Sequence, residues 1–276
     1  SGKIQANGEI TVDAKDGIVI NDDFTASGDI ALDADSNNSL DSDDLLTLGN
    51  RITVFSDGGQ INLNATSGEI LASGSITLKA DKGIKINDSI ASSGTTTIDS
   101  DVDNDGTGNF TLAELMTVDT NNNNLTITSN DIDISGSIDS GTASTTLLVS
   151  DKGTIGLGDV EEGEAPGLSI SGLELQNITA TDLTIGNSNG NLTVDNITAG
   201  NSQNITGTVT LKATKDGSGI TFTGLDSTFN ALSVQADDGV TVNTNLITDV
   251  GSLSVDTSGT LKTIASVAVS GDVSLT

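Results

Sequence analysis

The sequence of 276 residues contains no cysteine and no histidine. Their absence excludes a disulfide framework and thiol chemistry, and it removes the usual ligands of zinc, copper and haem sites. Tryptophan and tyrosine are also absent, so 5 phenylalanines are the only aromatic residues. Exposed aromatic anchors, which often dominate recognition surfaces, are therefore scarce.

Basic residues are few, with 10 Lys and Arg against 39 Asp and Glu, and the net charge is −29. Such a charge repels nucleic acid and anionic membranes, attracts divalent cations and keeps a protein soluble. No apolar run approaches the length of about 18 residues that a membrane-spanning helix needs. We expect neither nucleic-acid binding nor membrane insertion.

Repetition is the dominant feature of the chain. The segment GEITVDAKDGIVINDDFTASG, Gly8 to Gly28, returns later in the chain as GSITLKADKGIKINDSIASSG, Gly74 to Gly94. The glycine that opens the segment recurs at nearly equal intervals, at Gly8, Gly74, Gly141, Gly207 and Gly271. Self-similarity at fixed periods indicates repeated units that bury their apolar faces against their neighbours.

Within a unit, apolar and polar residues alternate, as at Ile10, Val12 and Ala14, which is typical of strands with one buried face. Gly, Asn, Asp and Ser separate these short segments and favour turns. We predict an all-β fold, a right-handed parallel β-helix of about 12 to 13 coils of about 20 to 22 residues, in super-repeats of about 66. The predicted core is a column of aliphatic residues: Ile10, Ile30, Leu32, Ile52, Val54, Ile76, Leu78, Leu125, Ile127, Leu183 and Ile185.

The phase of the two ends suggests how the β-helix is used. The opening segment SGKIQANG, Ser1 to Gly8, matches SGEILASG, Ser67 to Gly74, and GDVSLT from Gly271 begins a further repeat. Neither end shows a polar cap, although an open coil exposes unpaired backbone groups. We expect residues 1–276 to form one continuous β-helix that lies inside a longer repeat array or stacks end to end with other copies.

Two stretches carry a family resemblance. They read TVDTNNNNLTITSNDIDISGSIDSGTASTTLLVSDKGTIGLGDV from Thr117 and LSISGLELQNITATDLTIGNSNGNLTVDNITA from Leu168. They resemble the repeats of the large filamentous-haemagglutinin-like exoproteins of bacteria, most clearly over residues 109–199. The resemblance implies a secreted or cell-surface protein with a right-handed β-helical shaft that serves adhesion or fibre building.

Two acidic segments are candidates for metal binding. In DSDVDNDGTGNFTL, Asp101, Asp103, Asp105 and Gly106 have the spacing of a calcium loop, although Leu112 stands where such a loop has a bidentate Glu. The segment DADSNNSLDSDD places Asp33, Asp35, Asn37, Ser39 and Asp41 at an equivalent place one super-repeat earlier. No cofactor is required by the sequence, and calcium is the one that these residues would take. Solvated acidic turns are the alternative for both segments.

Three classes of function remain open. A structural shaft that forms or extends an extracellular filament needs only stacked coils and polar faces, and its partners are other copies, end to end or laterally, or adjoining repeats of the same chain. An adhesin module needs a distinct surface patch. A β-helical polysaccharide-active enzyme needs paired carboxylates and sugar-stacking aromatics, and the latter are missing. We predict a non-enzymatic shaft outside the bacterial cell, with the adhesin as the alternative.

Overall fold

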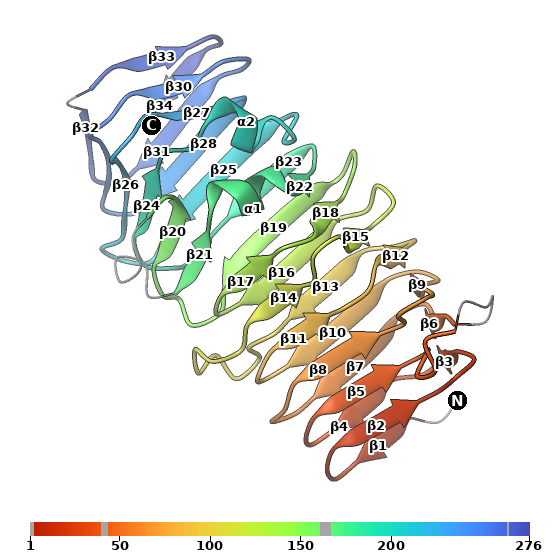
Figure 1. Cartoon of the computed structure of the whole chain (residues 1–276). Coiled ribbons are helices and arrows are strands. Elements are labelled where there is room, and N and C mark those ends of the chain that lie inside the picture. The colour runs from red at the N-terminus through yellow and green to blue at the C-terminus, as the bar shows by residue number, and fades with distance from the viewer. Residues whose placement is uncertain (1–2, 40–43, 161–166, 264) are drawn as a thin grey trace. The chain divides into compact units, whose positions relative to one another are not determined.

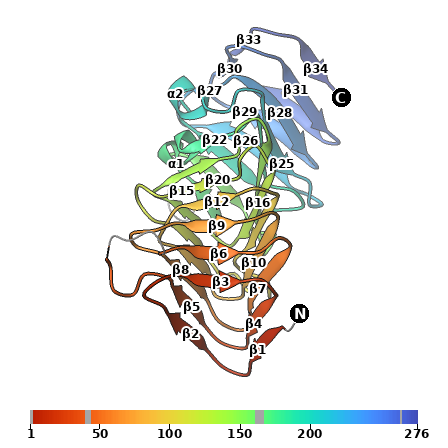
Figure 2. The same cartoon turned by 90° about the vertical axis from the view of Figure 1, so that its right-hand side faces the viewer.

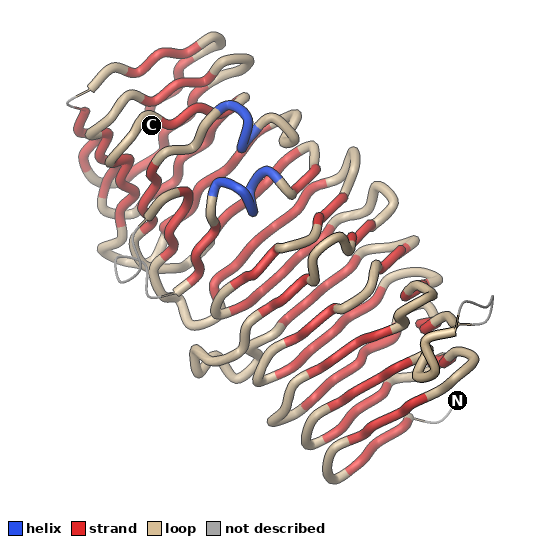
Figure 3. The backbone as a smooth tube through the Cα atoms, in the orientation of Figure 1, coloured by secondary structure: helices blue, strands red, loops and turns tan. Residues whose placement is uncertain are grey.

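Parallel strands of two to six residues make up nearly all regular structure of the computed structural model, which describes residues 3–39, 44–160, 167–263 and 265–276 (Figures 1 and 3). Two compact units divide the chain, Ser1–Thr142 and Ala143–Thr276. In both units the strands pair with strands of neighbouring coils, and these pairings are parallel. The fold is a parallel β-helix, as the sequence predicted.

The first unit has three faces, and each coil contributes one strand to each face. Face A consists of β1 (Ile4–Ala6), β4 (Phe24–Ala26), β7 (Ile52–Ser56), β10 (Ile76–Ala80), β13 (Thr96–Asp99) and β16 (Leu125–Ser129). Face B consists of β2 (Ile10–Asp13), β5 (Ile30–Asp33), β8 (Ile61–Asn64), β11 (Ile84–Ile86), β14 (Phe110–Leu112) and β17 (Ile132–Ile134). Face C consists of β3 (Ile18–Ile20), β6 (Leu46–Leu48), β9 (Ile70–Ala72), β12 (Ile90–Ser92), β15 (Thr117–Asp119) and β18 (Ser137–Asp139).

The second unit also winds over three faces. Face D consists of β19 (Ser144–Val149), β23 (Asp182–Ile185), β25 (Thr208–Ala213), β28 (Ala231–Ala236), β31 (Leu253–Thr257) and β34 (Val273–Leu275). Face E consists of β21 (Leu168–Ile170), β20 (Ile155–Gly158), β24 (Leu192–Asp195), β26 (Gly219–Thr223), β29 (Gly239–Val242) and β32 (Thr260–Thr263). Face F consists of β27 (Ser227–Phe229), β30 (Leu246–Thr248) and β33 (Val267–Val269).

Two one-turn helices interrupt the first coils of the second unit, α1 (Gly172–Gln176), followed by β22 (Ile178–Thr179), and α2 (Ala199–Ser202). Each begins with a capping box, formed by Ser171 with Glu174 in α1 and by Thr198 with Asn201 in α2. Such caps satisfy the free N–H groups at a helix start, so even one turn is stabilised. Helices this short leave no signal in the periodicity of the sequence.

Inward-pointing aliphatic side chains form the core of each unit. Ile76 of β10 lies in register with Ile52 of β7 on one side and with Thr96 of β13 on the other. Ten of the predicted core residues are buried: Ile30, Leu32, Ile52, Val54, Ile76, Leu78, Leu125, Ile127, Leu183 and Ile185. Ile10 is only half-buried because β2 is the edge strand of face B and pairs with β5 alone.

The sequence repeat and the coil run out of phase in the first unit. Gly8 precedes β2 on face B, whereas its counterpart Gly74 precedes β10 on face A. Coil length also varies more than predicted, because the step from Thr96 to its partner Leu125 is much longer than the step from Ile4 to its partner Phe24. Loops of different length absorb these differences, so similar sequence copies lie on different faces.

Candidate metal centre

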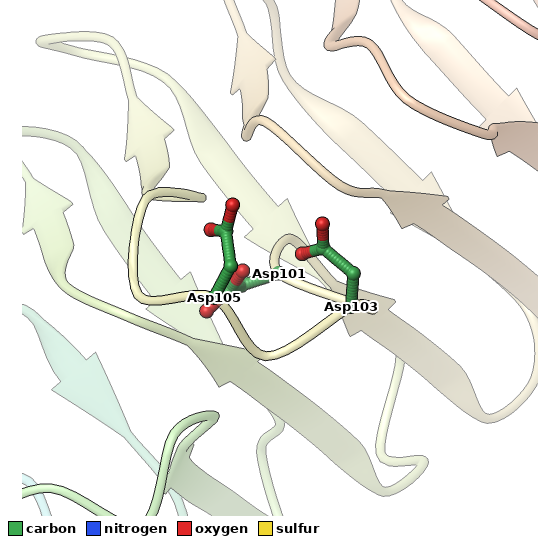
Figure 4. Close-up of side chains that lie close together, drawn as sticks. All are labelled: Asp101, Asp103 and Asp105. Atoms are coloured by element: carbon green, nitrogen blue, oxygen red, sulfur yellow. The ribbon is translucent and has the colours of Figure 1, made fainter.

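The loop between β13 and β14 brings three predicted ligands together (Figure 4). Asp101, Asp103 and Asp105 each place a carboxylate oxygen within 4.8 Å of the others. Within the part of the chain that the structure describes, these are the only three acidic side chains grouped so closely. Asp101 is fully buried, whereas Asp103 and Asp105 are exposed.

Short-range hydrogen bonds give this loop its shape. The carboxylate of Asp101 accepts a hydrogen bond from the N–H of Gly106 at 3.1 Å. Asp105 Oδ1 accepts two hydrogen bonds from Thr107, one from its N–H at 3.0 Å and one from its hydroxyl at 2.6 Å. Asn104 and Gly106 have positive φ angles of 56° and 81°, which Asn tolerates and Gly adopts without steric cost. The sequence Asp-Asn-Asp-Gly at residues 103–106 therefore suits the backbone conformation of this turn.

The loop is also fixed to its surroundings. The N–H of Val102 donates to the carbonyl of Ala80 in the preceding coil at 3.1 Å. At the other end of the loop, a Cβ atom at Gly108 would lie 1.9 Å from the carbonyl oxygen of Ser100. Only glycine therefore lets the chain pass Ser100 here, and the buried hydroxyls of Ser100 and Ser129 bond to each other at 2.7 Å beside it.

Negative charge accumulates at this corner between faces A and B. Desolvation raises the pKa of Asp103, and the charge of Asp105 adds to the rise. Asp81, at the same corner one coil earlier, has its pKa raised by burial first and by the charge of Asp103 second, while a hydrogen bond from the N–H of Gly58 opposes the rise. A bound cation would offset the repulsion between carboxylates that contributes to the raised pKa values of Asp103 and Asp81.

The second predicted segment lies at a different corner. Because β5 belongs to face B and β13 to face A, the two acidic loops are not equivalent, and the expectation that they are is wrong. The predicted residues here are Asp33, Asp35, Asn37, Ser39 and Asp41, and Asp41 lies outside the described residues. The buried carboxylate of Asp35 accepts hydrogen bonds from the N–H groups of Ser39 at 3.3 Å and of Ser67 at 3.0 Å. Asp35 therefore connects two coils.

Asp88 is a buried carboxylate that the sequence analysis missed. Its Oδ2 accepts a hydrogen bond from the N–H of Ala65 at 2.9 Å. Burial raises the pKa of Asp88, the hydrogen bond from Ala65 opposes this, and the charges of Asp33 and Asp35 add to the rise. The tripeptide Ile-Asn-Asp occurs at residues 20–22 and again at 86–88. This repetition is the sequence feature that could have indicated a structural role for the carboxylate of Asp88.

The chemistry of the loop at residues 101–105 suits a hard cation, because carboxylate oxygens are the ligands that Ca²⁺ prefers. The position of the missing bidentate Glu is taken by Leu112, whose side chain is fully buried in β14. That position therefore contributes to the core and offers no ligand. Calcium binding by Asp101, Asp103 and Asp105 stays a prediction.

No protein-family model matches the chain, and no curated protein and no solved structure shows significant similarity to it. The resemblance to filamentous-haemagglutinin-like exoproteins therefore stays a prediction from the quoted segments. In the part of the chain that the structure describes, neither the length nor the apolar character of any helix is sufficient to cross a membrane.

Proposed function

We propose that this chain is a non-enzymatic, secreted structural protein, a β-helical shaft that forms or extends an extracellular filament by stacking of coils. The observation that carries the proposal is the open apolar interior of the last coil. A cavity of about 470 Å³ lies there, lined only by apolar side chains, among them Leu261, Val267, Val273 and Leu275. Leu275 and Val273 are 59% and 56% exposed. Covering such surface yields about 25 cal/mol for each Å² removed from water.

The first coil offers a second open edge. Its strands β1, β2 and β3 each pair on one side only, with β4, β5 and β6. Ile4 is 52% exposed, and Ile10, Val12 and Ile18 are only half-buried. An unpaired strand edge next to apolar side chains is a template for a further strand. A coil from another copy, or from adjoining repeats of the same chain, would satisfy both features.

The outer faces of the coils favour a filament that grows through contacts at the ends of the β-helix rather than along its sides. Thr53, Thr77, Thr97 and Thr126 form an in-register column on the outer side of face A, so this face is polar. The net charge of −29 opposes lateral contact between copies. End contacts are apolar and pair backbone groups, so they are the ones that outweigh this repulsion.

The test is concentration-dependent association, measured by sedimentation. The Val267→Asp variant puts a charge into the open cavity, whereas Ala268→Asp puts the same charge on the outer side of the same strand. We expect the wild type and Ala268→Asp to associate as concentration rises, and Val267→Asp to stay monomeric. A wild type that is monomeric throughout, or a Val267→Asp variant that associates like the wild type, would contradict the proposal.

One surface feature favours the alternative, an adhesin. A polar groove of about 400 Å³ runs along face E and is lined by side chains that include Thr193, Thr221, Thr241, Asp238 and Lys262. The three threonines lie in register on successive coils, so their hydroxyls repeat at about 4.8 Å. A repeating polar ligand such as a linear glycan would match them. Thr221→Val should abolish binding on a glycan array, and Thr210→Val on face D should not.

A further inference from the structure

The groove on face E is built from two rows of outward residues that cross the strands β24, β26, β29 and β32. At its centre β26 and β29 are neighbouring strands (Figure 2). In one row Gly219 lies in register with Gly239, so two successive strands present no side chain there. The other row holds one residue of each strand, and all lie in register: Thr193, Thr221, Thr241 and Lys262. Both rows line the cavity of about 400 Å³.

Polar side chains bound the glycine row at both ends. On β32, Thr260 lies in register with Gly239 and continues the row with a side chain. Directly before β24, the side chain of Asn191 accepts a hydrogen bond from the N–H of Gly219 at 3.0 Å. Both Thr260 and Asn191 line the cavity, as does Asp238 in the corner loop between β28 and β29. The length of the space over the two glycines is therefore set by side chains within the groove.

The polar groups of the groove suit a ligand rich in hydroxyl groups. A threonine hydroxyl and an asparagine amide both donate and accept hydrogen bonds, and a sugar hydroxyl does the same. The two charged side chains that line the groove, Asp238 and Lys262, have opposite signs. The groove thus carries no net charge, whereas the chain as a whole carries −29 and repels acidic ligands. A neutral glycan fits this balance best.

The direction of the two rows decides how such a ligand lies. Each row takes one residue from each coil, so its members repeat about every 4.8 Å parallel to the axis of the β-helix. A ligand that followed β26 instead would pass from Thr221 to Thr223, which lies outside the groove. From Thr193 to Lys262 the threonine row covers three coil steps, which is about 14 Å.

We infer that face E binds a neutral, linear oligosaccharide that lies parallel to the axis of the β-helix, across β24, β26, β29 and β32. The sugar rings lie over Gly219 and Gly239, and their hydroxyl groups bond to the threonine row, one coil after another. This inference rests on the adhesin alternative, to which it adds the charge, the orientation and the length of the ligand.

Titration of the full chain with oligosaccharides of increasing length tests the inference. The probes are the neutral cello-, xylo-, manno- and N-acetylated chito-oligosaccharides, each from monosaccharide to hexasaccharide, and the acidic oligogalacturonates. Affinity for a neutral series should rise with length and level off once the ligand spans about 14 Å. It should not change with salt, because no net charge takes part. An affinity that is equal at all lengths would overturn the orientation, and one that falls steeply with salt would overturn the neutral class.

Matched variants locate the ligand on face E. Thr241→Val removes one hydroxyl from the row and should weaken binding of the hexasaccharide by about tenfold. Thr223→Val removes a hydroxyl from the outer side of β26, outside the groove, and should leave binding unchanged. Equal affinities of these two variants would overturn the inference.

The outcomes separate the ligand from the function. Binding of oligogalacturonates alone would overturn the inference and leave an adhesin standing. No binding of any series would contradict both the inference and the adhesin. Sedimentation of the same samples tests the shaft on its own, because Thr241→Val lies on an outer face and should associate like the wild type.

Discussion

Replacing Leu78 by alanine tests the stacked core most simply. Leu78 is fully buried in β10, in register with Val54 on one side and Ile98 on the other. Large-to-small changes in a core cost about 2 to 5 kcal/mol, and the cost rises with the cavity that remains. Backbone pairing on both sides fixes the strands that carry Val54 and Ile98, so the site cannot collapse. We therefore expect a loss of about 3 to 5 kcal/mol, in the upper part of that range.

The assay is urea unfolding followed by far-UV circular dichroism, because the chain has no Trp or Tyr to give a fluorescence signal. Thr77→Ala is the matched control, since Thr77 is the outward neighbour on the same strand and only half-buried. It should change stability by less than about 1 kcal/mol. Equal effects of Leu78→Ala and Thr77→Ala would refute the inward assignment of β10 and the account of the core.

Three further predictions concern the corners of the coils. Millimolar calcium should raise the melting temperature of the wild type, since it would bind the folded loop alone, and Asp103→Asn should remove the effect; a calorimetric titration without a saturable site would refute the calcium prediction. Because the pKa of Asp88 is raised in the folded state, its contribution to stability is present at low pH and is lost as the pH rises through that pKa. Melting temperature should therefore fall as the pH rises above 3.8, the ordinary pKa of an aspartate, and Asp88→Asn should flatten this decrease; an unchanged pH profile in the variant would contradict the assignment. Gly108→Ala should destabilise the loop at residues 100–108 because its Cβ would meet the carbonyl oxygen of Ser100, whereas Gly8→Ala, with no atom within 4 Å of its Cβ, should be neutral in the same melting experiment; equal melting temperatures for the two variants would show that the loop has room at Gly108.

The fold class was predictable because alternation and turn residues act locally. Ile52, Ile76 and Leu125 alternate with outward threonines, and this period alone assigns them to the buried side of their strands. The offset between the sequence repeat and the structural coil could not be predicted from this alternation. It depends on how many residues each corner loop takes up, and that number is set by packing and hydrogen bonding across coils. The loop after Asp99, which Gly108 closes, is one such case.

The candidate site was predictable in part. The spacing of Asp101, Asp103 and Asp105 reflects a local turn, so the sequence was sufficient to bring these side chains together. Asp81 and Asp88 were missed because their roles depend on neighbouring coils, where they accept hydrogen bonds from Gly58 and Ala65. Both hydrogen bonds span 23 residues, but the alternation of apolar and polar residues within a strand carries no information on contacts between coils.

Fibre diffraction from concentrated, aligned protein tests the central claim, that this chain builds a filament by stacking coils, most directly. Coils that continue from one copy into the next predict a meridional reflection near about 4.8 Å, the spacing of paired strands. The reflection should be oriented on the meridian in the wild type and in Ala268→Asp, and it should become an unoriented ring in Val267→Asp, whose charge lies in the open cavity and prevents copies from joining into fibres. Separate particles with no oriented reflection from the wild type, at concentrations where the protein stays folded, would contradict the claim.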